Sequence, residues 1–375
     1  MGFENVPTTN FDFAVLRGKI LSAIEMYKDK DAAGVLKTAV LASGNHNFES
    51  RAGLNAVSFS TTELVTAHNL DGVAILEYLQ YRYNFKHYPL NHIVSEFPTV
   101  LAIEVSSLCN LKCRMCFQSS DTFASRVSRG LMSFELFCKI IDEAKIYGLK
   151  SIVIASRGEP LLNPELPKMI AYAKANGILD VKLNTNALLL TDKIAEALLR
   201  SGVDTIVFSV DSTDAELYRA IRGADIELAK ENIIRFSKMR KEIFSNTVIN
   251  MRIAIVVLKE FATAQRAKLK DDINYWNQFV GQVSVKDEND FIGVYDGELS
   301  HCFPTCSLLW ERLYVWHDGI INPCDIDFIS ELSLGNVKDV PIHELWHGEK
   351  MEKLRECHLG KKTDTPCPCR NCCGY

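Results

Sequence analysis

The chain has 375 residues, 47% of them hydrophobic, so it is long enough to bury a sizeable core in one large domain or two smaller ones. Its formal net charge of −5 provides no basic field for a nucleic-acid backbone. The first residues lack the charged and apolar regions of a signal peptide, and no apolar run approaches the length of a membrane span. We therefore expect a cytoplasmic globular protein with no nucleic-acid partner and no membrane segment.

Residues 1–95 are predicted to form an N-terminal helical region. Apolar residues recur at helical spacing in residues 11–27 and 32–43, and residues 60–83 resemble two helices joined by a turn. The last pattern admits a helix-turn-helix interpretation, but its Glu63, Asp71 and Glu77 are acidic where DNA contact needs cations. A packing cap or an appendage on the substrate side fits better.

From residue 99 short apolar strands alternate with amphipathic helices. Six strand candidates are residues 99–105, 150–155, 180–185, 204–210, 250–257 and 282–287. Helices of this length between strands favour parallel neighbours joined by right-handed crossovers. The pattern predicts an α/β fold, a partial (β/α)6 TIM-like barrel over residues 96–290, with its site at the carboxyl ends of the strands.

Twelve cysteines are distributed unevenly. Eight lie in the final quarter of the chain, where residues 291–375 are turn-rich and are predicted to form a small C-terminal domain. In a large chain without a signal sequence, grouped cysteines more often bind metal or act as redox groups than form disulfides. We interpret the isolated Cys138 as a small apolar group packed in the core.

Directly after the first strand, Cys109, Cys113 and Cys116 follow the spacing CxxxCxxC. Four thiolates complete a zinc site or saturate a four-iron cluster, whereas three leave one metal with an open position. An open position indicates chemistry rather than a purely structural role. A structural zinc completed by a distant Cys or His is the alternative.

This motif resembles that of the radical SAM superfamily, and the likeness spans roughly residues 99–290. The resemblance implies a partial barrel whose three cysteines bind a [4Fe-4S] cluster, with the open iron chelated by S-adenosylmethionine. It also implies reductive cleavage to a 5′-deoxyadenosyl radical that abstracts hydrogen from a substrate C–H bond. A flavodoxin- or ferredoxin-type protein would supply the electron. Met115 matches the apolar position that contacts the adenine.

The stretch "SRGEP" resembles the Gly-Gly-Glu-Pro element of that family, which receives the methionine amino group. Gly158, Glu159 and Pro160 are retained, and Arg157 replaces the first glycine. Glu159 is an acceptor at a strand end, and Pro160 fixes the turn without adding a donor. Arg157 either contacts substrate or pairs with an acid on the surface.

Two further stretches resemble the family at strand ends. Asn184 and Asn186, on either side of Thr185, match positions near the ribose, although Asn-Thr-Asn is also ordinary turn chemistry. Ser209 and Arg222 are candidates for the methionine carboxylate, which suits a guanidinium fork. In the alternative, Asp211 caps a helix and Arg222 is solvated; Arg252 is a further, less specific candidate for the carboxylate.

The C-terminal cysteines resemble those of SPASM/twitch extensions, which carry auxiliary iron–sulfur clusters. Seventeen residues separate Cys306 from Cys324, and a hairpin turning at "HDG" would bring these two sulfurs together. The resemblance implies one auxiliary [4Fe-4S] cluster held by Cys306, Cys324, Cys369 and Cys372. Cys367 or Cys373 could replace a ligand at the tail, and a structural zinc with the same four ligands is the chemical alternative.

A fully ligated auxiliary cluster most simply accepts the electron of a substrate radical, so we expect a radical SAM oxidoreductase. The single-cluster spacing resembles that of the aminocyclitol dehydrogenase branch, which implies a sugar or cyclitol alcohol as substrate. Asp325, directly after Cys324, resembles the base of sulfatase-maturing relatives, which implies that role for it, with Asp327 as the alternative. Radical modification of a peptide or protein side chain is the second interpretation. An epimerase using Cys302 or Cys357 as hydrogen donor, and a metal-stapled binding protein, are the others.

Overall fold

The computed structural model describes residues 13–26, 59–245, 248–288, 294–295, 305–360 and 368–372. Two compact units lie within residues 7–95 and 96–375. The expected helix at 32–43 lies outside the described residues, as do Cys302, Cys367 and Cys373. None of the described helices is both long and apolar enough to cross a membrane.

The N-terminal unit is helical where it is described. Its described helices are α1 (Phe13–Met26), α3 (Thr61–His68) and α4 (Val73–Asn91). The Ser60 hydroxyl accepts from the backbone of Glu63, whose carboxylate accepts from Ser60 in return, so α3 begins with a capping box. The nearly buried Glu63 also binds Arg82 at 2.6 Å and Lys86 at 2.5 Å. Two cations of α4 are thus bound within the unit, which speaks against the helix-turn-helix interpretation.

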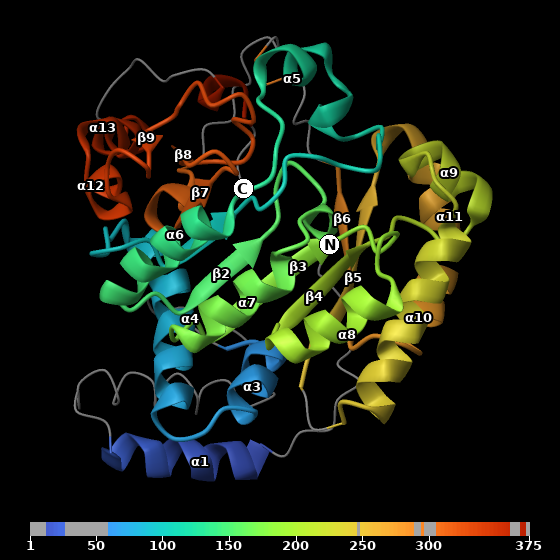
Figure 1. Ribbon diagram of the computed structural model, residues 1–375, viewed down its shortest axis with the longest axis horizontal. Helices are drawn as coiled ribbons and strands as arrows, with labels where there is room; N and C mark the ends of the chain where they lie inside the picture. Colours follow the sequence, from blue (N-terminus) through green and yellow to red (C-terminus); the bar gives the residue numbers. More distant parts are fainter. Residues whose placement is uncertain are drawn as a thin grey trace. The chain divides into compact units, whose positions relative to one another are not determined.

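The second unit is built on a nine-stranded sheet of order β6-β5-β4-β3-β2-β1-β7-β8-β9 (Figure 1). Its strands are β1 (Val100–Ile103), β2 (Ser151–Ile154), β3 (Asp180–Thr185), β4 (Thr205–Ser209), β5 (Asn250–Val257), β6 (Gln282–Asp287), β7 (Arg312–Val315), β8 (Ile320–Asn322) and β9 (Gly335–Asn336). Its described α-helices are α5 (Asp121–Arg126), α6 (Phe134–Ile146), α7 (Leu166–Ala175), α8 (Asp192–Ser201), α9 (Ala215–Arg222), α10 (Ile226–Glu242), α11 (Ala262–Trp276), α12 (Ile342–Trp346) and α13 (Glu349–His358).

Strands β1 to β6 pair in parallel in chain order, and helices cover their outer face (Figure 1). Burial alternates along β5, where Ile253 and Ile255 pack in the core while Arg252, Ala254 and Val256 face the opposite, inner side. In the described chain β6 and β9 remain at the two edges, so the barrel is not closed. The predicted partial α/β barrel is confirmed.

The cysteine-rich segment continues this sheet. Strand β7 pairs in parallel with β1 and forms an antiparallel hairpin with β8, as the "HDG" turn predicts. Gly319 in that turn has φ +92°, and a Cβ there would lie 2.5 Å from Asn336 Oδ1. The domain boundary at residues 290 and 291 stays a prediction, because residues 289–293 lie outside the described chain.

A buried ion pair joins the barrel strands to the C-terminal segment. Arg157 donates to the Glu104 carboxylate through Nε at 2.6 Å and Nη2 at 2.8 Å. Its Nη1 donates to the Phe328 carbonyl at 2.9 Å, and its guanidinium lies over the Trp316 ring. The His317 backbone donates to Glu104 at 3.2 Å. Arg157 is 4% exposed, so the expectation of a pair on the surface was wrong about its location.

Aromatic rings reinforce the same junction. Phe117 follows the last cysteine of the first motif and stacks on Phe328 at 4.8 Å between ring centroids. Phe123 of α5 packs against both rings, and Tyr295 meets Phe328 edge to face. The cysteine loop and the segment after Cys324 are therefore packed together.

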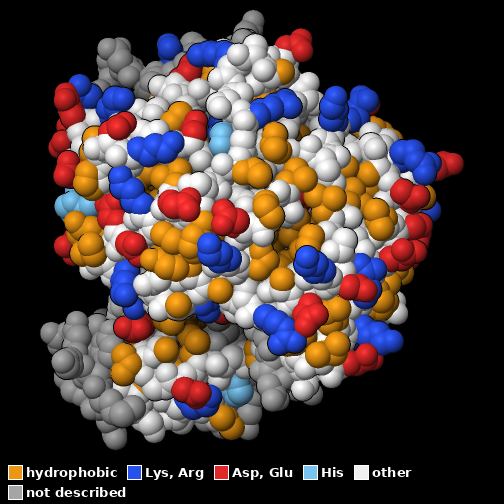
Figure 2. All heavy atoms as spheres, in the orientation of Figure 1, with side chains coloured by type: hydrophobic (Ala, Val, Ile, Leu, Met, Phe, Trp, Pro, Cys, Tyr) orange, Lys and Arg blue, Asp and Glu red, His pale blue; other side chains and the backbone are white. Residues whose placement is uncertain are grey.

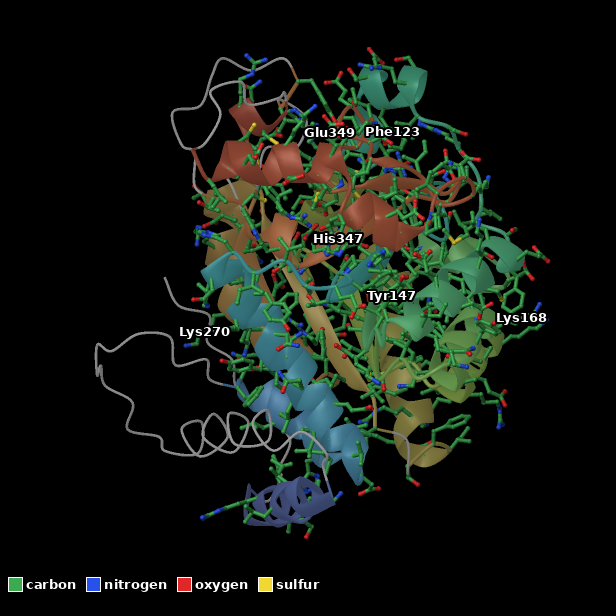
Figure 3. The ribbon with its side chains drawn as sticks, turned by 90° about the vertical axis from the view of Figure 1, so that its left-hand side faces the viewer. Phe123, Tyr147, Lys168, Lys270, His347 and Glu349 are labelled. Atoms are coloured by element: carbon green, nitrogen blue, oxygen red, sulfur yellow. The ribbon has the colours of Figure 1, made fainter. Side chains whose placement is uncertain are left out.

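His343 and His347 of α12 belong to a packed aromatic row. The His343 ring stacks on Tyr147 at 4.6 Å, and Phe97 stacks on the other side of Tyr147 at 5.0 Å. Figure 3 labels Tyr147 and His347 of this row. His347 Nε2 hydrogen-bonds the Glu96 carbonyl at 2.9 Å. The rings of His343 and His347 are thus both in contact with neighbouring residues.

Charged side chains on the visible face are mixed in sign. Figure 2 shows Lys and Arg interspersed with Asp and Glu on that face, and no large patch of one sign among the described residues in view. This agrees with the slightly negative net charge of −5 and offers no electrostatic track for a nucleic acid on that face.

We expect Arg157→Gln to lower the free energy of unfolding by about 3–5 kcal/mol, because it leaves the buried Glu104 without its cation. Urea denaturation under anaerobic conditions measures the change. The control is Arg126→Gln, since Arg126 pairs with Glu331 at 3.1 Å on the exposed surface between the same two segments. That exposed pair should contribute less than about 1 kcal/mol. Equal effects of the two substitutions would contradict the prediction.

Candidate functional site

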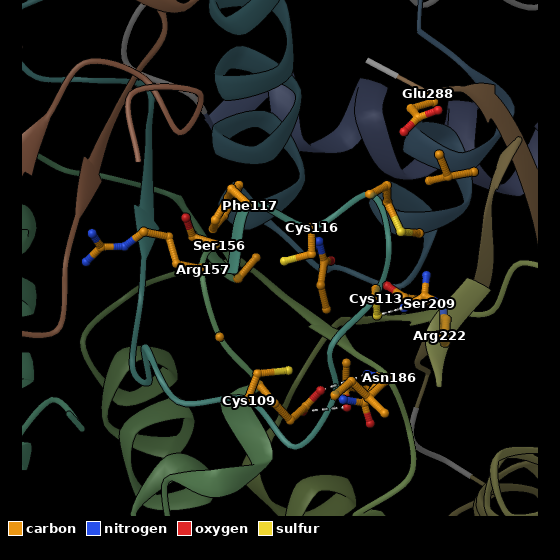
Figure 4. Close-up of a pocket in the computed structure, with 18 of the residues that line it drawn as sticks. Cys109, Cys113, Cys116, Phe117, Ser156, Arg157, Asn186, Ser209, Arg222 and Glu288 are labelled. Carbon is orange, nitrogen blue, oxygen red and sulfur yellow. Dashed lines mark hydrogen bonds between the residues drawn. The ribbon is translucent and has the colours of Figure 1, made fainter. Parts of the chain in front are cut away.

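A cavity of about 290 Å³ lies at the carboxyl ends of the strands (Figure 4). This is where a parallel sheet with crossover helices places its ligand sites. Its lining includes most of the site residues predicted from the sequence: Cys109, Cys113, Met115, Cys116, Gly158, Glu159, Asn184, Asn186, Ser209 and Arg222. Residues at the ends of four strands, β1 to β4, and at the end of α9 therefore meet at one space.

The three cysteines of the first motif surround this space (Figure 4). Backbone bonds hold their loop: Cys116 donates to the Cys113 carbonyl at 3.0 Å, and Arg114 donates to the Ile221 carbonyl at 2.9 Å. The backbone N–H of Gln118 reaches Cys116 Sγ at 3.5 Å. The loop thus presents three sulfurs to one cavity from a fixed backbone.

The donor set fits an iron–sulfur cluster. Burial raises the pKa of Cys109 to about 11 and that of Cys116 to about 12, so both thiols are neutral until a metal displaces their protons. In the described chain, no three His, Cys, Asp or Glu side chains are close enough together to hold a single metal ion. Three thiols around one cavity are the donors that the resemblance to the radical SAM superfamily implies for a [4Fe-4S] cluster.

Glu159 is fixed at the floor of the cavity. Its carboxylate accepts from Thr185 Oγ1 at 2.7 Å, from the Asn186 backbone at 2.8 Å and from the Leu161 backbone at 3.0 Å. Burial raises the pKa of Glu159 despite these donors. An ammonium group bound here would offset part of that desolvation, which is the role predicted for this residue.

The neighbours of Glu159 explain the rest of the "SRGEP" stretch. A Cβ on Gly158 would lie 2.2 Å from the Ser106 carbonyl oxygen, so only glycine fits against the strand that leads to the cysteines. Pro160 begins a short 3₁₀ helix and does not line the cavity. Its contribution is to direct the chain away after Glu159.

Arg222 is not solvated and Asp211 is not a helix cap. Asp211 is fully buried and accepts from Arg222 Nε at 2.7 Å, and Asp214 caps α9 in its place. Burial by itself would lower the pKa of Arg222, but the charges of Asp211 and Cys113 and the hydrogen bond to Asp211 together raise it. Arg222 Nη1 also reaches Cys113 Sγ at 3.8 Å. The alternative from the sequence is therefore wrong, and Arg222 sits between Asp211 and the first motif.

Two buried oxygens at the cavity lack a partner within the described part of the chain. These are Ser156 Oγ and Asn184 Oδ1, and both residues line the cavity. Ser156 also has φ +109°, a backbone conformation that non-glycine residues rarely adopt. Orphaned polar atoms at a cavity wall fit a hydroxyl-bearing ligand such as the ribose predicted near Asn184 and Asn186.

The C-terminal thiols form a second group. Burial, with the charge of Cys372 as a further cause, raises the pKa of Cys306 to about 11. Burial raises the pKa of Cys369 to about 12, and Cys306, Cys372 and Cys357 add to the effect. Burial also raises the pKa of Cys324, and the charge of Cys306 adds to that rise. The four predicted auxiliary ligands are thus neighbours, and their ligand role stays a prediction.

The structure also places thiols that the spacing did not assign. Cys357 on α13 is buried near Cys369, which the sequence gave no reason to expect. Cys138 is half-buried on α6 beside Tyr172 rather than packed in the core. The core prediction for Cys138 was wrong, because helical spacing placed it beside the buried face rather than on it.

The two candidate bases differ in their surroundings. Asp327 is fully buried and accepts from Tyr295 Oη at 2.8 Å and from the backbone of Glu331 and Leu332. Those bonds give Asp327 a structural role. Asp325 is half-buried directly after Cys324, and it is not among the described residues that line the cavity.

Lys286 and Glu288 at the end of β6 line the cavity without having been predicted. Lys286 faces the inner side because Val283 and Val285 pack in the core, and alternation along the strand could have revealed this. Glu288 lies beyond the strand and accepts from the Lys259 backbone at 2.9 Å. Its place depends on a turn that periodicity does not predict.

Comparison with known proteins agrees with this geometry. Residues 103–252 match the model of the radical SAM superfamily, and residues 306–373 match that of the iron–sulfur cluster-binding SPASM domain. AdoMet-dependent heme synthase of Methanosarcina barkeri is 31% identical over an alignment of 310 positions, which covers 69% of this chain and 85% of that protein.

The probable GTP 3′,8-cyclase of Methanococcus vannielii is 35% identical over 131 residues, which are 35% of this chain and 42% of that protein. The alignment thus spans less than half of the cyclase. SuiB of Streptococcus suis, solved with its precursor peptide SuiA, has a TM-score of 0.53 at 18% identity, covering 92% of this chain and 83% of that chain. The anSMEcpe structure with bound AdoMet has a TM-score of 0.52 at 19% identity over 68% and 82%.

At such low identity the structural matches establish the fold, whereas the two family models and the heme synthase establish the family. The chain belongs to the radical SAM superfamily, with a C-terminal SPASM domain that binds iron–sulfur clusters.

Proposed function

We propose that this radical SAM enzyme oxidises an alcohol of a sugar or cyclitol by two electrons. The observation that carries the proposal is the separation of the thiols into two groups. Three line the ligand cavity at the strand ends, and four others gather in the C-terminal segment, none of them in the cavity lining that is described. The thiols at the cavity would face substrate and cofactor. Those of the C-terminal segment would hold the group that accepts an electron.

The first group would hold the [4Fe-4S] cluster through Cys109, Cys113 and Cys116, leaving one iron open. When bound, this cluster and S-adenosylmethionine together supply a 5′-deoxyadenosyl radical that abstracts hydrogen from a substrate C–H bond. Glu159 would bind the methionine ammonium, with Gly158 and Pro160 shaping its turn. The remaining cofactor contacts would come from Met115, Asn184, Asn186, Ser209 and Arg222.

The second group would hold an auxiliary [4Fe-4S] cluster through Cys306, Cys324, Cys369 and Cys372. With four thiolates it has no open position for substrate. Oxidation of the hydroxyalkyl radical to a carbonyl then sends its electron to this cluster and its hydroxyl proton to a base. Asp325 is the proposed base, because Asp327 is committed to structural hydrogen bonds.

A small-molecule substrate is supported in two ways. Two of the relatives are named for making heme and for cyclising GTP, both small molecules. The described part of residues 7–95 consists of helices and contains no strand on which a leader peptide could pair. Peptide modification is the second candidate, supported by the fold shared with SuiB. A flavodoxin- or ferredoxin-type reductant in the cytoplasm, where thiols stay reduced, is the expected partner.

Anaerobic reconstitution tests the two clusters. We expect about eight irons per chain, the sum for two four-iron clusters, and reductive release of 5′-deoxyadenosine from S-adenosylmethionine. Cys113→Ala should lower the iron to about four and abolish that release. Cys138→Ala, a half-buried thiol outside both groups, is the control and should keep full iron. Zinc in place of iron, or an active Cys113→Ala protein, would rule the proposal out.

Deuterated sugars, cyclitols and peptides then identify the C–H bond by deuterium transfer into 5′-deoxyadenosine. For the substrate so found, we expect Asp325→Asn to lower the oxidised product formed per 5′-deoxyadenosine by about 100-fold, the usual contribution of a general base. Mass spectrometry gives both quantities. Solvent deuterium incorporated into an unoxidised product would instead indicate an epimerase, and transfer from peptides alone would favour the second candidate.

A further inference from the structure

Arg252 lies on the inner face of β5, directly below the cavity. It pairs in register with Val207 on β4, and Val207 pairs with Asn184, which lines the cavity. The next inner row holds small residues, with Ala254 paired to Ser209, also a lining residue. Arg252 is not among the described residues that line the cavity, but two residues along a strand rise roughly 6.6 Å, so its long side chain lies within reach of the row that does.

Within the described chain, Arg252 has no ion pair or hydrogen bond, and its buried Nε lacks a partner. Burial lowers the pKa of Arg252, as expected of a cation without a counter-ion. The inner faces of β4, β5 and β6 supply no carboxylate. Besides Arg252, the residues that alternate onto those faces are Thr205, Val207, Ser209, Asn250, Ala254, Val256, Gln282, Ser284 and Lys286.

The other two guanidinium groups at the site are neutralised by the protein itself. Arg157 has the buried Glu104, and Arg222 has the buried Asp211. Arg252 is half-buried, with its Nε buried and unpaired, and a charge that is partly removed from water without a counter-ion is costly unless a ligand compensates it. Arg252 is therefore positioned to bind an anion, and the described residues do not provide one.

We propose that Arg252 binds an anionic group of the substrate, a carboxylate or a phosphate, so that the substrate class is an anionic small molecule. The proposal rests on the function proposed above, since it takes the substrate to lie in the barrel interior beside the cofactor. A guanidinium fork matches both anions through paired N–H donors. The anion would fix the orientation of the substrate, and with it the C–H bond presented to the cavity.

The test uses the reconstituted full-length enzyme and three small probes: inorganic phosphate, acetate and the neutral acetamide. Equilibrium dialysis measures their dissociation constants in the millimolar range. We expect Arg252→Gln to weaken the anion by at least about ten-fold, the value of one hydrogen bond to a charged group. Arg252→Lys should lose less, and acetamide should not bind. The anion that binds more tightly distinguishes phosphate from carboxylate.

Arg219→Gln is the matched control, because Arg219 is an exposed cation on α9 and its loss should leave anion binding unchanged. Equal anion binding by wild type and Arg252→Gln would overturn the proposal, as would absence of saturable binding. A larger loss of affinity for S-adenosylmethionine than for the anions would also overturn it and assign Arg252 to the methionine carboxylate. Reductive cleavage by the wild-type protein, measured without these probes, reports separately on the proposed function.

Discussion

Strand β1 is hydrogen-bonded in parallel on both sides, to β2 of the barrel and to β7 of the C-terminal segment. Everything that follows β1 is therefore positioned against both halves of the unit at once. Glu104, directly after the strand, binds Arg157 from the end of β2 and the backbone of His317 from beyond β7. The cysteine loop begins shortly after Glu104, so the position of its sulfurs depends on β1, the strand that both halves share.

Desolvation explains why the polar groups at this edge are so thoroughly paired. A buried carboxylate or guanidinium costs several kcal/mol unless a partner compensates it. Glu104 and Asp211 each hold an arginine, and Glu159 holds three donors from β3 and its own turn. Donor and acceptor of each of these bonds belong to the chain itself, so they hold the charged groups around the cavity in fixed orientations, which favours catalysis by fixed dipoles.

Much of this was predictable from local patterns. Alternation of strands and helices gave the partial barrel, and CxxxCxxC after the first strand gave the motif that lines the cavity. Partners across strands were not predictable, because they depend on register. Arg157 and Glu104 are 53 residues apart in the sequence, and their meeting requires the β1–β2 pairing. Cys357 near Cys369 likewise follows from the packing of α13, which no cysteine spacing reveals.

The alternation along β5 predicts that Arg252 faces the barrel interior, but it does not predict whether a counter-ion lies there. The absence of a counter-ion among the described residues is what gives Arg252 its influence on substrate specificity. A neutral ligand in the barrel interior would leave the half-buried guanidinium without a counter-ion, so the site would disfavour it by the cost of that unpaired charge rather than by a clash. Lys286, exposed at the mouth, stays hydrated and adds little such discrimination, but its charge favours the approach of an anion. The outer cation thus acts on the rate of encounter, and the inner one on the choice of substrate.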